Sequence, residues 1–157
     1  MEKFLFEAPV LEPFLDVEGV ASSEDAKEAR RLMHDFVSGY PQIRVSLCVL
    51  RLSPKTNISE FSHWMLNASP LGEGESSLDR RRTLLLVMDL NTAEASISLG
   101  YDAEALIGEN SARSALTMSA PAYVAGRFAE GTRILLEAID HVLQQTVARL
   151  KQIQESR

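Results

Sequence analysis

Acidic side chains gather around two apolar segments in the middle of the chain. Two of them flank the apolar run Thr83–Met88, namely Asp79 and Asp89. Three more follow the next apolar segment, namely Asp102, Glu104 and Glu109. Carboxylate oxygens on loops are the ligands that hard divalent cations prefer, and such a cation neutralises the charge of a phosphate ester. Loop carboxylates are physically suited to a divalent cation, and solvated loop charge is the alternative interpretation for each of these acids.

A run of three arginines, Arg80-Arg81-Arg82, stands directly before the same apolar segment. Guanidinium groups donate forked hydrogen bonds that match a phosphate, so Arg81 and Arg82 are candidate phosphate-binding residues. Three consecutive side chains on an extended segment cannot all face one site. The alternative is a solvated flank that keeps the adjacent apolar strand soluble.

Composition and charge exclude several other functions. The formal net charge of −6 disfavours a nucleic-acid partner, because an acidic surface repels phosphate backbones. The three histidines have no second histidine or cysteine at zinc-site spacing. The single cysteine, Cys48, lies in an apolar strand pattern and is expected to be a buried, inert thiol. No stretch has the ~20 apolar residues of a membrane span.

Hydrophobic periodicity predicts the elements that position these residues. Ser22 with Asp25 predicts the start of a helix that ends at Gly39. Residues 42–52 alternate in the manner of a strand, and Asn57 with Glu60 predicts a second, short helix. Residues 68–82 are expected to form a long exposed loop.

The second half of the chain predicts a hairpin followed by helices. Thr83–Met88 indicates a central strand that is covered on both faces, and Glu94–Leu99 its hairpin partner. Ser111 is expected to begin a helix that breaks near Pro121, and the last helix is expected from Phe128 to Ile153. The order predicts a mixed α/β sheet with a central hairpin and helices on both faces, a three-layer α/β/α sandwich. The loops 68–82 and 100–111 are its candidate ligand-binding loops.

Several segments of the chain resemble the TPM family, the domain shared by a thylakoid acid phosphatase and many bacterial envelope proteins. The family has a strand followed by a glycine-tyrosine-glycine-leucine-glutamate turn, and here Gly100, Tyr101 and Glu104 match it. Further similarities, in the family's order, lie at 16–24, 39–49, 84–87 and 121–128. Gly100 is expected to serve backbone geometry through a positive φ, and Tyr101 to serve packing.

The resemblance implies a divalent-metal site, calcium or magnesium, among Asp79, Glu104 and Glu109, with Glu104 and Asp79 as catalytic residues of an acid-phosphatase-like domain. One departure concerns the loop before the apolar strand, where the family has aspartate, asparagine and glycine. This chain has Asp79 followed by the three arginines. A non-catalytic binding or assembly module for a protein complex is therefore the alternative function, with a protein partner in place of a phosphate ester.

The resemblance and the hydrophobic pattern together predict one domain over 16–150, an N-terminal arm over 1–15 and a polar tail over 151–157. The N-terminus has no apolar core of signal-peptide length and carries acids early. The expected location is cytoplasmic, or envelope-associated if a leader precedes these residues in the natural protein.

Overall fold

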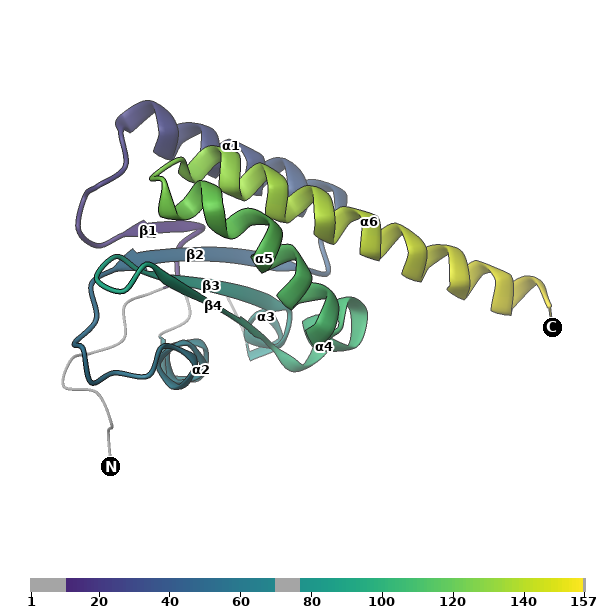
Figure 1. Cartoon of the computed structure of the whole chain (residues 1–157). Coiled ribbons are helices and arrows are strands. Elements are labelled where there is room, and N and C mark those ends of the chain that lie inside the picture. Colours follow the sequence, from purple (N-terminus) through teal and green to yellow (C-terminus); the bar gives the residue numbers. More distant parts are fainter. Residues whose placement is uncertain (1–10, 70–76, 157) are drawn as a thin grey trace.

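The computed structural model describes residues 11–69 and 77–156. Its strands are β1 (Phe14–Asp16), β2 (Arg44–Leu50), β3 (Thr83–Asp89) and β4 (Glu94–Leu99). Its helices are α1 (Ser23–Gly39), α2 (Ile58–Ala68), α3 (Ser77–Arg81), α4 (Tyr101–Ile107), α5 (Glu109–Val124) and α6 (Phe128–Glu155). Figure 1 shows the sheet in the middle of the molecule and α6 extending beyond it toward the C-terminus.

The four strands form one mixed sheet in the order β1-β2-β3-β4. The first three strands run parallel, and β4 pairs antiparallel with β3 through the predicted hairpin. The hairpin therefore contributes one central strand, β3, and one edge strand, β4. The short β1 begins within the predicted N-terminal arm 1–15, and its pairing with β2 makes it the opposite edge strand of the described sheet.

Alternation along β2 divides the core between the two faces of the sheet, as the sequence pattern predicts. Val45, Leu47 and Val49 belong to the larger cluster, under α1, α5 and α6. Cys48 and Leu50 belong to a smaller cluster that α2 covers. Every residue of β3 is buried, which confirms a central strand covered on both faces.

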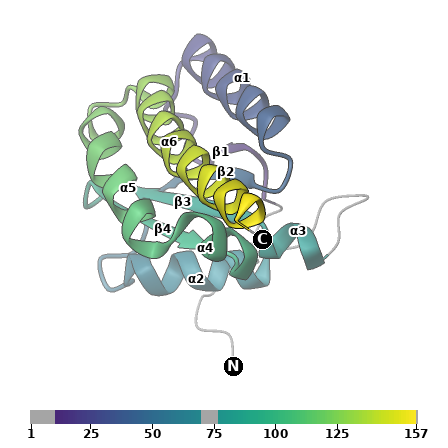
Figure 2. The same ribbon diagram turned by 90° about the vertical axis from the view of Figure 1, so that its right-hand side faces the viewer.

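The helices complete a three-layer arrangement. In Figure 2, α1, α6 and α5 lie along one face of the sheet and α2 lies along the other. The side chains of the two core clusters agree with this division. The predicted mixed α/β fold with helices on both faces is confirmed, although the larger share of the helical packing is on one face.

The helix starts at Ser22 and Asn57 are confirmed, because each side chain accepts a hydrogen bond from the backbone N–H three residues later. The predicted break at Pro121 is wrong: α5 begins at Glu109 and continues through the proline to Val124. The expected loops contain two short helices, α3 and α4, while residues 70–76 of the first loop and residues 1–10 of the predicted arm 1–15 lie outside the described residues. The last helix reaches Glu155, since its final turns are rich in good helix formers.

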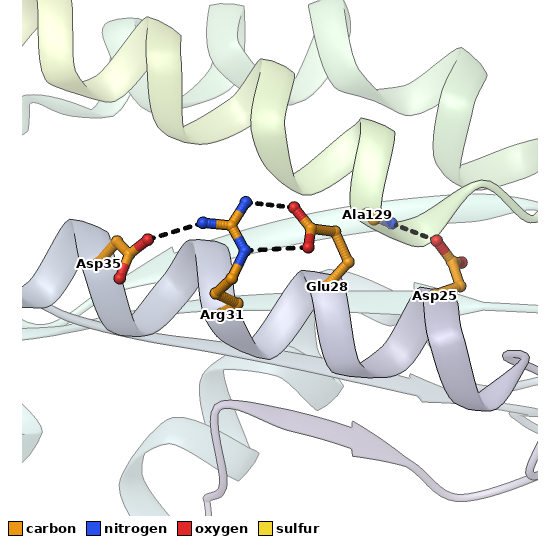
Figure 3. A network of polar contacts seen from close by, with 5 residues as sticks. All are labelled: Asp25, Glu28, Arg31, Asp35 and Ala129. Atoms are coloured by element: carbon orange, nitrogen blue, oxygen red, sulfur yellow. Dashed lines mark hydrogen bonds and ion pairs between the residues drawn. The ribbon is translucent and has the colours of Figure 1, made fainter.

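Asp25 joins the two long helices of the larger layer. Its carboxylate accepts hydrogen bonds from the backbone N–H groups of Phe128 at 2.9 Å and Ala129 at 3.0 Å. These are among the first N–H groups of α6, which have no partner within their own helix. Figure 3 shows the carboxylate turned toward Ala129, while Arg31 on the same helix pairs with Glu28 and Asp35 at the surface. A residue of α1 therefore caps α6.

Replacing Asp25 with alanine is expected to lower the free energy of unfolding by about 2 kcal/mol, because it removes a charged cap from the N-terminus of α6. Urea unfolding followed by circular dichroism measures the change. Asp35→Ala is the matched control on the same helix, since its carboxylate only pairs with exposed Arg31. An equal loss of stability in both variants would show that the Asp25 cap contributes no more to the free energy of unfolding than the exposed Arg31–Asp35 pair.

Candidate functional site

The two predicted ligand-binding segments meet at one end of the β3–β4 hairpin. The backbone N–H of Gly100 donates to the carbonyl of Thr83 at 2.8 Å, so α4 begins where β3 begins. Arg81 of α3 pairs with Asp102 of α4 at 3.0 Å. The structure thus brings together the turn that resembles the TPM motif and the arginine run, which are about twenty residues apart in the sequence.

The three arginines have three different partners. Arg80 donates to the carbonyl of Ser69 at 2.7 Å, Arg81 pairs with Asp102, and Arg82 pairs with Asp79. The expectation that they cannot share one site is confirmed. Arg80 and Arg81 connect α3 to neighbouring segments, whereas Arg82 pairs back onto α3, so the run differs from a purely solvated flank. Among the described atoms, Nε of Arg82 is buried without a hydrogen-bond partner.

Two expectations about the Gly100 turn are wrong. Gly100 has a φ of −63°, which any residue adopts, so positive φ is not the reason for a glycine here. A side chain at this position would instead collide with the backbone of Arg81, whose carbonyl oxygen lies 2.5 Å from an added Cβ. Tyr101 is 74% exposed and does not pack in the core. Its ring lies beneath the Arg81 guanidinium, 5.3 Å from the centroid.

Glu104 of α4 and Glu109, the first residue of α5, lie together away from the Arg81–Asp102 pair. Both line a cavity of about 180 Å³, together with Ile97, Leu99 and Ala112. Asp102 and Glu104 are two positions apart on one helix, which places their side chains roughly 200° apart around its axis. The acidic cavity and the Arg81–Asp102 pair are therefore separate features. Glu109 also pairs with exposed Arg113 at 2.8 Å.

Asp79 does not line this cavity. Its carboxylate pairs with Arg82, and its backbone carbonyl accepts the hydroxyl of Thr83 at 2.6 Å. Within 11–69 and 77–156, no three His, Cys, Asp or Glu side chains are close enough to hold one metal ion. The three acids that the resemblance groups together are thus divided, with Glu104 and Glu109 at the cavity and Asp79 at the arginine run.

Asp89 is a buried structural residue at the other end of β3. It is 3% exposed and accepts three hydrogen bonds, from Leu52 N at 3.0 Å, Asn91 N at 2.9 Å and Thr92 Oγ1 at 2.9 Å. These bonds fix the hairpin turn and attach it to the segment after β2. Solvated loop charge is therefore the wrong interpretation for this acid.

Comparisons with known proteins show the fold and do not name a family. No family model and no curated protein sequence matches the chain. It shares its fold with solved bacterial domains. The N-terminal domain of a P. gingivalis protein aligns over 85% of this chain and 82% of its own length, with 17% identity and a TM-score of 0.62.

Two further NMR structures have the same arrangement. The N-terminal domain of a Corynebacterium glutamicum protein aligns over 88% of this chain and 81% of its own, with 15% identity and a TM-score of 0.59. The BA42 protein of Bizionia argentinensis aligns over 83% and 86%, with 9% identity and a TM-score of 0.64. Because the identities are this low, the three structures establish a common fold and nothing more. Function must therefore be argued from this chain's own residues.

Other features of the molecule do not gather the predicted site residues. A groove of about 640 Å³ between α5 and α6 is lined largely by apolar side chains, with His141 and Glu137 at its wall. Cys48 is buried, and burial raises the pKa of its thiol to about 12, which agrees with an inert cysteine. None of the described helices has an apolar stretch that could span a bilayer.

The sequence did not single out the apolar wall of the acidic cavity. Ile97 and Leu99 are two positions apart on β4 and therefore share one face of the strand, and that face turns toward α5. The signal was therefore present in the alternation of the strand. What the alternation could not supply was the position of α4, which brings Glu104 beside these two side chains.

Proposed function

We propose that the chain is a TPM-like domain that binds a hydrated divalent cation at the acidic cavity between β4, α4 and α5. The observation that carries the proposal is that Glu104 of the family-like turn and Glu109, five residues after it, line the same cavity. Hydrolysis of phosphate monoesters is the activity that the resemblance attaches to such a site.

Two carboxylates, those of Glu104 and Glu109, suit Mg²⁺ better than Ca²⁺. Ca²⁺ takes about 6–8 oxygen ligands, whereas Mg²⁺ keeps several waters and needs only one or two carboxylates. Glu104 and Glu109 would hold a largely hydrated ion of the second kind. The Glu109–Arg113 pair is exposed on both sides, and such pairs contribute only about 0–1 kcal/mol, so a cation can displace the arginine.

A bound cation would supply charge neutralisation for a phosphate group. The arginines that could assist, Arg81 and Arg82, are paired with Asp102 and Asp79, neither of which lines the cavity. A phosphate ester would have to compete with those carboxylates. Cation binding is accordingly the part of the proposal that the cavity supports best, and hydrolysis depends further on freeing an arginine.

Glu104→Gln and Glu109→Gln are each expected to weaken Mg²⁺ and Ca²⁺ binding at least tenfold, because each removes one of two charged ligands. Isothermal calorimetry measures binding. Hydrolysis of a chromogenic phosphate ester with and without a chelator measures activity. Asp102→Asn is the matched control, since its carboxylate lies on α4 but faces Arg81. Unchanged cation binding in both glutamine variants would overturn the proposed site.

A non-catalytic binding module is the second candidate function, and a specific observation favours it. Arg80 and Arg81 hold neighbouring segments together, Arg82 pairs locally with Asp79, and no three acids converge within the described residues. These side chains stabilise the end of the hairpin, which suits a domain that presents a fixed surface. Chromogenic ester hydrolysis that never exceeds the buffer rate, together with capture of a defined ligand, would favour this second candidate.

A further inference from the structure

The outer edge of the sheet at β4 has backbone groups that point away from β3. Gly100 N donates to Thr83 O at 2.8 Å, so the residues of β4 at every second position from Gly100 pair with β3. Arg44 N donates to Arg82 O at 2.9 Å, which fixes the same alternation on the β2 side of β3. The N–H and C=O groups that point outward therefore belong to Ala95, Ile97 and Leu99.

Within the described ranges, 11–69 and 77–156, no hydrogen bond joins these three outward-facing residues to another element. Their side chains are half-buried and pack against the larger core cluster. In Figure 2, β4 lies at the edge of the sheet between α5 and α2. The segment from Ala95 to Leu99 has no charged residue and no proline, the two features that usually block strand addition.

The carboxylates of Glu104 and Glu109 stand beside this edge. They share their cavity with Ile97 and Leu99, which are two of the three residues whose backbone groups face outward. In a strand that pairs with β4, the side chains on one of its two faces would therefore lie near Glu104 and Glu109. We propose that β4 binds an extended peptide segment by strand addition, and that a lysine or arginine of this segment reaches the acidic cavity.

Charge favours a basic segment over a second copy of this chain. Two β4 strands paired about a twofold axis would bring both pairs of carboxylates, and the exposed Glu94 of each copy, to the same interface. The net charge of −6 adds to this repulsion between copies. A basic strand gains from the same charges. Strand addition does not depend on cation binding, although both use Glu104 and Glu109.

The test uses a fluorescein-labelled peptide of about seven residues that alternates valine with lysine, and a valine–glutamate peptide as its counterpart. Fluorescence anisotropy measures binding. Amide hydrogen exchange by NMR then reports which backbone groups become protected. We expect the valine–lysine peptide to bind and the valine–glutamate peptide not to bind. The bound peptide is expected to slow amide exchange at Ala95, Ile97 and Leu99, while the exchange rates of the β3 amides stay unchanged.

Two kinds of variant distinguish the contribution of the β4 backbone to peptide binding from that of the acidic side chains. Ala95→Pro removes one outward N–H without removing a β3–β4 hydrogen bond, and it is expected to weaken peptide binding about tenfold. Glu104→Gln with Glu109→Gln is expected to weaken binding of the lysine peptide roughly fivefold and to reduce its salt dependence. Asp102→Asn, which faces Arg81, is expected to leave binding unchanged.

Each outcome decides the proposal. Protection of the three edge amides by the lysine peptide supports it, even if Ala95→Pro proves too unstable to measure. Binding without that protection, or no binding, overturns it. Protection that rises with protein concentration and without peptide would assign the edge to a second copy instead. Calorimetry with Mg²⁺ in the absence of peptide tests the cation site separately, so the two proposals can fail independently.

Discussion

Replacing Gly100 with alanine is expected to lower the free energy of unfolding by roughly 3 kcal/mol. An added Cβ would lie 2.5 Å from the carbonyl oxygen and 2.6 Å from the carbonyl carbon of Arg81, and closer still to the carbonyl oxygen of Arg80. These are backbone atoms, which cannot rotate away as a flexible side chain does. Relief therefore requires α3 and α4 to separate, which strains the Gly100–Thr83 hydrogen bond and the Arg81–Asp102 pair.

Thermal unfolding followed by circular dichroism checks this expectation. At about 3 °C per kcal/mol for a chain of this size, Tm should fall by roughly 9 °C. Gly39→Ala is the matched control, because an added Cβ there meets nothing within 4 Å and Gly39 is helical. It should leave Tm unchanged or raise it slightly. A Gly100→Ala protein as stable as the Gly39→Ala protein would show that α3 and α4 can move apart without cost.

Hydrophobic periodicity predicted the fold well because burial, the quantity that it reports, decides the strands and the larger helices. The alternation of β2 and the continuous apolar run of β3 gave the correct faces and the correct central strand. Pro121 was misjudged because a proline removes one hydrogen bond, a local cost that packing against α6 and β4 can offset. The Ala115 and Ala122 side chains of α5 are buried on both sides of this proline.

The candidate site was less predictable because its geometry depends on contacts between distant residues. The resemblance grouped Asp79 with Glu104 and Glu109, and the structure separates them because Asp79 lies on α3, where it pairs with Arg82, outside the cavity that the two glutamates line. Gly100 was recognised as special for the wrong reason, since a close approach between backbones leaves no local pattern. Asp25 was identified as the capping partner of Ser22, while its second role at α6 requires a contact across 103 residues.

Asp89 is the second position where a single substitution should have a large effect. Asp89→Ala is expected to cost roughly 3 kcal/mol of unfolding free energy. The variant leaves the buried N–H of Leu52 without an acceptor and removes two hydrogen bonds that close the hairpin turn. Urea unfolding measures the loss, and faster amide exchange at Leu52 would locate it.

Asp89→Asn distinguishes this structural role from a chemical one. The Oδ1 atom accepts both backbone hydrogen bonds, and an asparagine keeps that atom. Its amide nitrogen would replace Oδ2 and can donate to the Thr92 hydroxyl, so the cost should be only about 1 kcal/mol. Glu94→Ala, at the register partner of Asp89, is the exposed control and should stay within about 0.5 kcal/mol of the parent. If Asp89→Asn folds well but loses cation binding or hydrolysis, the carboxylate has a chemical role that its buried hydrogen bonds do not explain.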